Sequence, residues 1–585
     1  MKKVFKYLVP YWWQFLLVIA TTYGNVWASL QLPTLMSNIV NKGILGNDQS
    51  YIISSGIHML LVTAFGSLAS IATGFLASRI ATGFARKVRL ETFKKIESFS
   101  LNEINKFSTA SLITRSTNDI QQVQMVTVMV LRIALQAPLM AIGAIFSALH
   151  TAPSMTWVMA FSVIALLVVV GTISSLVVPK FKLQQKLVDQ MNLVARENLT
   201  GLRVIRAFNN EHVEEKKFND VNRKLTKLGL WINRVISLMQ PAMMLIINFT
   251  MLAIVWVGAH YVVDGSLEIG NMMAFMQYAM QVITSFLLLV MIMVMLPRAQ
   301  VSAGRIGEIL DTKNSIEEAK HPEELDTDKS GILEFRHVAF TYPGAESAVI
   351  NDVNFVAKPG QTTAFIGSTG SGKSTLINLI PRLYDVSSGQ ILIDGHDIRR
   401  IARKDLTRVL GFVPQRGVLF SGTVESNIKY GKADISDAEM HDAATTAQAD
   451  FINDLDGKFH AHIAQGGSNV SGGQKQRLSI ARALAKDPEI LVFDDSFSAL
   501  DYKTDAALRK ALREKEANKT ILIVAQRIST IRHADQILVL DNGHVVGKGT
   551  HEELLRNCDV YREIAESQFS EEEMKKELKE AGYGK

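Results

Sequence analysis

A glycine-rich run that carries one lysine and five serine or threonine residues is the strongest chemical signal in this 585-residue sequence. It follows an apolar segment that predicts a strand, Thr363-Ala364-Phe365-Ile366, and opens a predicted helix, Thr375–Ile380. Glycines let backbone N–H groups wrap phosphates at a helix N-terminus, while a lysine adds positive charge and a hydroxyl can bind Mg²⁺. The pattern is typical of a P-loop and predicts a nucleotide site formed by Gly367, Ser368, Thr369, Gly370, Ser371, Gly372, Lys373, Ser374 and Thr375.

Two further motifs fit the same chemistry. The predicted strand Ile490-Leu491-Val492-Phe493 ends in Asp494 and Asp495. An acidic residue in that position is typical of a Walker B motif, so Asp494 is expected to hold Mg²⁺ through water, beside Ser374. Ser471-Gly472-Gly473 precedes a predicted helix and forms a second phosphate-binding N-terminus. One site does not need two such termini, so the second is expected to serve another nucleotide.

The elements that position these residues occupy only the second half of the chain. The first 297 residues hold five stretches without Asp, Glu, Lys or Arg, and the longest has 47 residues. A membrane span needs about 20 residues, so the longest stretch holds two spans. The sequence therefore predicts six spans, at about 14–41, 52–78, 127–149, 155–179, 238–263 and 270–297.

The basic residues indicate how these spans are oriented. Lys2, Lys3 and Lys6 precede the first span, eight Lys or Arg lie between spans two and three, and twelve lie between spans four and five. The other side has only Lys42. The positive-inside rule predicts an integral protein of the cytoplasmic membrane with both termini in the cytoplasm. The formal charge of +6 is explained by this topology, so no nucleic-acid partner is expected.

The predicted organisation is an all-α membrane domain fused to an α/β P-loop ATPase domain. The membrane domain covers residues 1–310, with six helices and long cytoplasmic helical extensions. A charged linker covers 311–330, the nucleotide-binding domain 331–569, and a polar tail 570–585. The single cysteine, Cys558, excludes a disulfide framework and a cysteine-based metal site within the chain.

With these motifs in this order, the chain resembles a half-transporter of the ATP-binding cassette (ABC) exporters along nearly its whole length. In that family two cassettes pair head to tail, and each ATP lies between one chain's P-loop and the other chain's signature. The resemblance implies that Tyr342 stacks on adenine and that Gln415 meets both Mg²⁺ and the membrane domain. It also implies that Ser471, Gly472 and Gly473 form the signature, which acts on the ATP of the partner chain.

Two catalytic positions depart from the family pattern. Asp495 stands where the family has the glutamate that polarises the attacking water, and Gln526 stands where it has a switch histidine. The aspartate carboxylate is retracted by about 1.5 Å, which is enough to lose a hydrogen bond. Glutamine can donate a hydrogen bond but cannot carry a proton. Together the two residues predict a degenerate site, with Gln415, that binds ATP and Mg²⁺ but hydrolyses ATP slowly.

A degenerate site favours a heterodimer, because a homodimer would have two slow sites. The predicted function is ATP-driven multidrug export of amphipathic small molecules, with a partner half-transporter that has the consensus glutamate and histidine. The enzyme class is a transport-coupled ATP hydrolase that needs its partner for activity. Membrane lipid and a hydrophobic or amphipathic substrate are the other expected partners. A lipid or peptide exporter and an ATP-gated channel or sensor are the alternatives.

Overall fold

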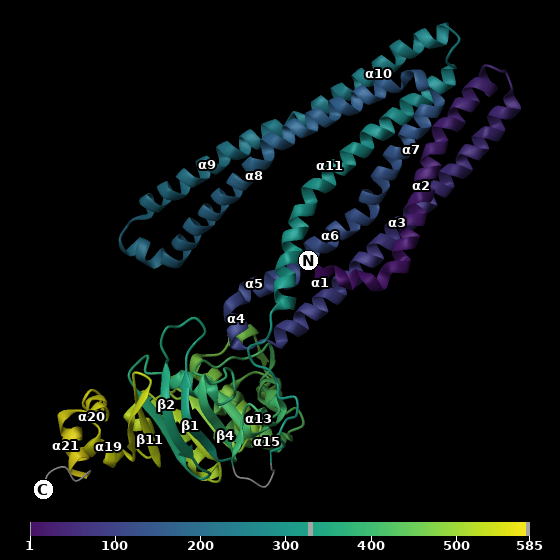
Figure 1. Ribbon diagram of the computed structural model, residues 1–585. Coiled ribbons are helices and arrows are strands. Elements are labelled where there is room, and N and C mark those ends of the chain that lie inside the picture. The colour runs from purple at the N-terminus through teal and green to yellow at the C-terminus, as the bar shows by residue number, and fades with distance from the viewer. Residues whose placement is uncertain (1, 326–330, 581–585) are drawn as a thin grey trace. The chain divides into compact units, whose positions relative to one another are not determined.

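Long apolar helices and mixed α/β elements separate into two units in the computed structural model, which describes residues 2–325 and 331–580 (Figure 1). Unit 1 comprises Met1–Glu97 and Ser108–Thr312, and unit 2 comprises Ser98–Phe107 and Lys313–Lys585. The predicted linker and tail lie partly outside the described residues, at 326–330 and 581–585. A helical domain fused to an α/β domain confirms the predicted fold class.

Unit 1 is helical because an apolar segment in a bilayer finds no water for its backbone N–H and C=O groups. Within a single segment, only a helix gives all of these groups a hydrogen-bond partner. Among the described residues, six helical stretches are long and apolar enough to span a membrane, as predicted: Lys6–Ile44, Gln49–Glu97, Thr109–Thr151, Pro153–Ala207, Glu211–Val263 and Ile269–Leu289. Their helices are α1 (Lys2–Phe5), η1 (Lys6–Tyr11), α2 (Trp12–Asn38), η2 (Ile39–Ile44), α3 (Gln49–Glu97), α5 (Thr109–Thr114), η3 (Arg115–Asp119), α6 (Ile120–Met129), η4 (Val130–Ala134), α7 (Leu135–Thr151), η5 (Pro153–Met155), α8 (Thr156–Ala207), α9 (Glu211–Ser237), α10 (Met239–Val263) and α11 (Ile269–Asp311).

Several of these helices are longer than a bilayer is thick. Helix α3 has 49 residues and α8 has 52. At 1.5 Å per residue they are about 74 and 78 Å long, whereas the hydrocarbon core is about 30 Å thick. Helices α8 and α9 continue side by side as a long hairpin (Figure 1). These lengths are those expected of spans with helical extensions outside the membrane.

A short piece of the first half of the chain belongs to unit 2. Helix α4 (Leu101–Phe107) follows α3 in the sequence, yet Leu101 packs against the apolar core of unit 2. The Asn105 amide donates to the Tyr384 hydroxyl at 3.4 Å, and Glu103 accepts from the Ser315 backbone N–H at 3.1 Å. Burial alone would raise the pKa of Glu103, but hydrogen bonds from Ser100 and Ser315 outweigh it and lower that pKa. The chain therefore ties α3 covalently to the second unit.

Unit 2 is built on a six-stranded sheet in the order β12-β11-β3-β10-β9-β6, in which only the β12 pairing is antiparallel. A four-stranded antiparallel sheet, β2-β1-β4-β5, and a two-stranded sheet, β7-β8, accompany it. The strands are β1 (Leu333–Phe340), β2 (Ile350–Ala357), β3 (Thr362–Gly367), β4 (Ser388–Ile393), β5 (His396–Asp397), β6 (Leu410–Val413), β7 (Gly422–Thr423), β8 (His462–Ile463), β9 (Ile490–Asp494), β10 (Thr520–Val524), β11 (Gln536–Asp541) and β12 (His544–Gly549).

The central strands are buried on both faces, which explains their continuous apolar sequences. On β9, Leu491 and Phe493 belong to one core cluster, and Ile490 and Val492 to the other. The surrounding helices are α12 (Lys373–Leu379), α13 (Arg403–Val409), α14 (Val424–Ile428), α15 (Asp437–Thr446), α16 (Gly472–Ala485), α17 (Tyr502–Lys515), α18 (Ile528–Ile531), α19 (His551–Asn557), α20 (Asp559–Glu566) and α21 (Glu571–Glu580), with short 3₁₀ turns η6 (Lys429–Gly431), η7 (Asp450–Asp454), η8 (Lys458–His460) and η9 (Gln465–Gly467). The P-loop strand β3 lies between β10 and β11.

The C-terminal helix α21 is held to the core of unit 2 by a buried polar network. His551 bonds the Tyr561 hydroxyl at 2.7 Å on one side and the Glu577 carboxylate at 3.1 Å on the other. Glu577 also pairs with Arg532 at 3.1 Å. Met574 of the same helix is buried in the apolar core. The described part of the predicted tail therefore packs against unit 2, through Met574 on its apolar side and Glu577 on its polar side.

Replacing Glu577 with alanine should destabilise unit 2 by about 1–3 kcal/mol, because His551 and Arg532 lose a buried partner. This should lower the midpoint of thermal unfolding of the purified protein by several degrees. Glu572→Ala, at an exposed position of the same helix, is the matched control and should leave the midpoint unchanged. Equal midpoints for the two variants would contradict a stabilising role of the network.

Candidate nucleotide site

The P-loop adopts the strand, turn and helix that its sequence predicts. It runs from the end of β3 to the start of α12. Gly370 (φ 88°) and Gly372 (φ 98°) lie in the left-handed region, which glycine adopts without strain. A Cβ on Gly372 would also lie 2.7 Å from the Ile350 side chain. Both glycines are therefore needed for the turn that presents the N-terminus of α12.

Lys373 is folded over this loop. Its ammonium donates to the carbonyl oxygens of Gly367 (2.9 Å) and Ser368 (2.7 Å) and to the Ser371 hydroxyl (3.3 Å). Burial lowers the pKa of Lys373, and the nearby charges of Asp495 and Asp494 partly oppose this. A half-buried ammonium beside backbone N–H groups is suited to bind the phosphates of a nucleotide.

Ser374 and Asp494 form an oxygen pair. The Ser374 hydroxyl, in the first turn of α12, donates to the Asp494 carboxylate at 3.0 Å. Asp494 ends β9 and is 5% exposed, so burial raises its pKa, and the Ser374 hydrogen bond opposes this shift. A hydroxyl and a carboxylate are hard oxygen donors of the kind that Mg²⁺ prefers. The residues present therefore fit a Mg²⁺ ion bound together with nucleotide phosphates and water.

Asp495 is enclosed by two amides. Its carboxylate oxygen Oδ2 accepts hydrogen bonds from Gln526 Nε2 at 2.7 Å and from Gln415 Nε2 at 3.4 Å. Asp495 is 6% exposed, and burial raises its pKa against the effect of these hydrogen bonds. Its backbone is left-handed (φ 47°), a conformation that is uncommon outside glycine but that aspartate adopts more readily than most residues. The structure thus brings together the three residues Asp495, Gln526 and Gln415.

A cavity of about 250 Å³ lies next to Asp495 and Gln526. The residues that line it lie at or after the ends of β9 and β10 and include Ser498. The Ser498 hydroxyl donates to the Asp495 backbone oxygen at 2.8 Å, which fixes the turn after β9. The cavity has room for a side chain longer than aspartate at position 495.

Tyr342 lies beside the P-loop helix. Its hydroxyl is 2.9 Å from the Thr375 hydroxyl, and its ring meets that of Tyr384 edge-on, with centroids 5.4 Å apart. The residue is half-buried. An aromatic ring next to the N-terminus of α12 is suited to stack on a base, and the adenine-stacking role that the resemblance implies for Tyr342 stays a prediction.

The signature segment is at the surface of unit 2. Ser471 is the N-cap of α16 and forms a capping box, in which its hydroxyl accepts from the Gln474 N–H and its own N–H donates to Gln474 Oε1 at 2.8 Å. Ser471 and Gly472 are exposed, and a Cβ on Gly472 would meet nothing within 4 Å. A Cβ on Gly473 would meet the Ala499 carbonyl oxygen at 3.2 Å. This exposed helix N-terminus can receive a phosphate from a second molecule.

Two glutamines that the sequence analysis did not single out connect these motifs. Gln476, 2% exposed, donates to the Pro414 carbonyl at 3.1 Å and accepts from the Gly417 N–H at 3.0 Å, so it joins α16 to the segment around Gln415. Gln568 donates to the Gln526 carbonyl at 2.8 Å and accepts from the Ile528 N–H at 2.9 Å. Neither has a local sequence signal, because each acts through residues at least 40 positions away.

A helical membrane unit joined to a P-loop unit with a Walker B carboxylate and an exposed signature defines a membrane-embedded transport ATPase. Two family descriptions match the chain: "ABC transporter transmembrane region" over residues 15–286 and "ABC transporter" over residues 350–498. The chain therefore belongs to the ABC transporter family, as the sequence resemblance predicted. It is an exporter half-transporter whose ATPase domain couples ATP hydrolysis to transport.

Individual relatives cover nearly the whole chain. The uncharacterized ABC transporter ATP-binding protein MT1311 of Mycobacterium tuberculosis is 42% identical over 544 residues, which is 92% of this chain and 93% of the relative. The probable multidrug resistance ABC transporter ATP-binding/permease protein YheI of Bacillus subtilis is 35% identical over 80% of each chain. The structure of a bacterial Atm1-family ABC exporter with ATP bound is similar with a TM-score of 0.77 and 26% identity, covering 97% of this chain and 98% of that one.

Proposed function

We propose that this chain is the degenerate-site half of a heterodimeric exporter of amphipathic small molecules. The observation that carries the proposal is the Asp495–Gln526 pair. A general base must reach the proton that it removes. Here the shorter carboxylate is buried and bound to a glutamine amide at 2.7 Å. Because that glutamine cannot carry a proton, the chain's own Walker site binds ATP and hydrolyses it slowly.

The nucleotide would be bound by residues that lie together in unit 2. Lys373 and the loop Gly367–Gly372 would bind its phosphates, and Tyr342 would stack on adenine. Ser374, Asp494 and Gln415 would hold Mg²⁺, directly or through water. The bound ion would screen the charge of the phosphates. The surface position of Ser471 and Gly472 supports a role in the second ATP site of the dimer, opposite the P-loop of the partner.

The substrate class is supported by the membrane half and by one relative. The six spans have apolar sequences, and among the relatives YheI is described as a probable multidrug resistance transporter. The excess of Lys and Arg between spans two and three and between spans four and five supports cytoplasmic termini. An ATP-gated channel or sensor is the second candidate, because a slow ATP site suits gating. Vectorial movement of a dye into inverted vesicles at the expense of ATP distinguishes export from gating.

The purified chain by itself should have almost no steady-state ATPase activity, because every site that it can form with a second copy contains Asp495 and Gln526. Activity should appear when the chain is co-purified with a half-transporter that has glutamate and histidine at these two positions. The measurement is phosphate release by the chain alone, by the partner alone and by the pair. Robust turnover by the chain alone would refute the degenerate-site proposal.

A further inference from the structure

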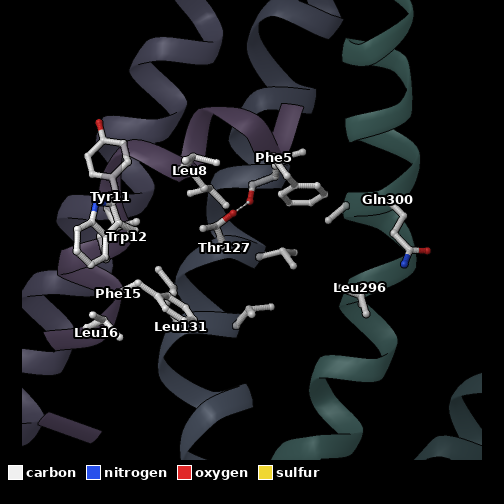
Figure 2. A pocket seen from close by; sticks show the side chains of 16 residues that line it. Phe5, Leu8, Tyr11, Trp12, Phe15, Leu16, Thr127, Leu131, Leu296 and Gln300 are labelled. Atoms are coloured by element: carbon white, nitrogen blue, oxygen red, sulfur yellow. Dashed lines mark hydrogen bonds between the residues drawn. The ribbon is translucent and has the colours of Figure 1, made fainter. Parts of the chain in front are cut away.

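A cavity of about 590 Å³ lies in unit 1 between the N-terminal helix η1 and three of the membrane-spanning segments (Figure 2). The side chains of Phe5, Leu8 and Trp12 come from the N-terminal segment, Thr127 and Leu131 from the third span, and Leu296 from α11. Figure 2 shows Tyr11, Trp12 and Phe15 on one side and Leu296 and Gln300 on the other, with Thr127 between them and Phe5 nearer to Gln300. The volume lies within the range of small-molecule sites, about 300–1,000 Å³.

The helix that closes the cavity is anchored at both ends. At one end Val4 is fully buried in a cluster with Phe84 and Ile306. At the other end Tyr11 packs against Gly83 of α3 so closely that a Cβ on this glycine would lie 3.0 Å from the tyrosine ring carbon that bears the hydroxyl. Because the N-terminal segment is held by packing at Val4 and at Tyr11, the cavity between these two contacts is enclosed by fixed side chains.

The interior of the cavity is mostly apolar, and its polar groups are those of Tyr11, Trp12, Thr127 and Gln300. None of the described residues that line it is Asp, Glu, Lys, Arg or His. The Thr127 hydroxyl donates to the Val123 carbonyl of its own helix at 2.8 Å, so its donor is already used (Figure 2). Because polar ligands lose hydration on entering such a site, it favours a hydrocarbon chain.

The rim of the cavity has a different chemistry. In a 3₁₀-helix, residues three positions apart lie one above the other, so Lys6 shares a row with Val9, which lines the cavity together with Trp12 at the start of α2. Lys6 is exposed, and Trp12 and Trp13 are 64% and 51% exposed, which places aromatic side chains where a bilayer interface lies. The sequence adds Lys2 and Lys3, and no acidic residue precedes Asp48. A cationic rim above an apolar interior matches a ligand with an anionic head and a hydrocarbon tail.

We propose that this cavity binds an anionic glycerophospholipid of the adjacent leaflet, with one acyl chain inside it and the headgroup phosphate at Lys6. The bound chain would pack between η1, the third span and α11, so the lipid would tie the N-terminal helix to two spans. The proposal depends only on membrane insertion, and it is independent of the degenerate-site proposal.

The experiment uses the full-length purified chain in mixed micelles with a phosphatidylglycerol that carries a photoreactive diazirine near the end of one acyl chain. Peptide mass spectrometry should locate the crosslinks in residues 5–16 and 123–131. A phosphatidylcholine with the same labelled chain should crosslink there about fivefold less, because one lysine near a membrane surface changes lipid affinity by about that factor. Equal labelling by both lipids would overturn the anionic headgroup.

Two pairs of variants test the interior and the rim. Val126→Trp and Leu16→Trp fill the cavity and should abolish the crosslinks, whereas Val128→Trp, outside the lining on the same helix, should retain them. Leu16 is 54% exposed, so its variant decides the test even if the buried Val126 variant does not fold. Lys6→Gln should reduce phosphatidylglycerol labelling to the phosphatidylcholine level, and Lys42→Gln should not. Unchanged crosslinks in Leu16→Trp would overturn the site.

Discussion

Replacing Ser471 with alanine should lower the steady-state ATPase activity of the paired transporter by about 10²–10³-fold, the usual effect of removing a donor aimed at developing charge. The reason is that Ser471 and Gly472 are exposed at the N-terminus of α16, where, under the proposed function, they would complete the competent site on the partner. Lys373→Ala should have a much smaller effect, because under the same proposal Lys373 would belong to the slow site. Phosphate release by the two heterodimers, measured side by side, tests this order.

The capping role of Ser471 needs its own control, because loss of an N-cap costs about 1 kcal/mol of stability. Ser436 forms the same kind of capping box at the start of α15, with Glu439, and lies in none of the nucleotide motifs. Ser436→Ala should therefore lose a similar amount of helix stability while ATPase activity is retained. Gly472→Ala is a second probe, since its Cβ fits the free chain but would obstruct a phosphate that approaches from the partner. A larger loss of activity in Lys373→Ala than in Ser471→Ala would overturn the assignment.

The local parts of the site could be predicted from the sequence because each is a contiguous pattern. A strand, a glycine-rich turn and a helix follow one another in residues 362–379, and Asp494 ends an apolar strand. The six spans were predictable for the same reason, because the cost of burying charge in a bilayer leaves long uncharged stretches.

The contacts between distant segments could not be predicted in this way. Asp495 and Gln526 meet because β9 and β10 are adjacent and parallel, with Asp494 opposite Val524. The order of strands in a sheet cannot be predicted from a local sequence pattern. Helix α4 packs in unit 2 although more than 200 positions separate Asn102 from Ser315, its hydrogen-bond partner. The fit of Tyr11 against Gly83 likewise depends on tertiary packing.

The double substitution Asp495→Glu with Gln526→His should convert the slow site into a site that hydrolyses ATP. The longer carboxylate regains its reach toward the attacking water, and the cavity of about 250 Å³ beside Asp495 accommodates the added methylene. The imidazole replaces an amide that now binds the carboxylate at 2.7 Å, and it can carry a proton. Even the chain alone should then gain ATPase activity, because two copies would form two restored sites with intact signatures.

In the heterodimer, the restored site should add hydrolysis without adding a transport cycle, so transport per ATP should fall or stay flat. The measurement is to trap nucleotide in the wild-type and double-mutant pairs, determine ATP and ADP at each site, and follow dye efflux in the same vesicles. Asp495→Gln with Gln526→His is the matched control, since it has the size of glutamate without the charge and should leave hydrolysis slow. If ADP forms no faster at the restored site than in this control, Asp495 and Gln526 are not the cause of slow hydrolysis, and the cause must lie in the signature that the partner contributes.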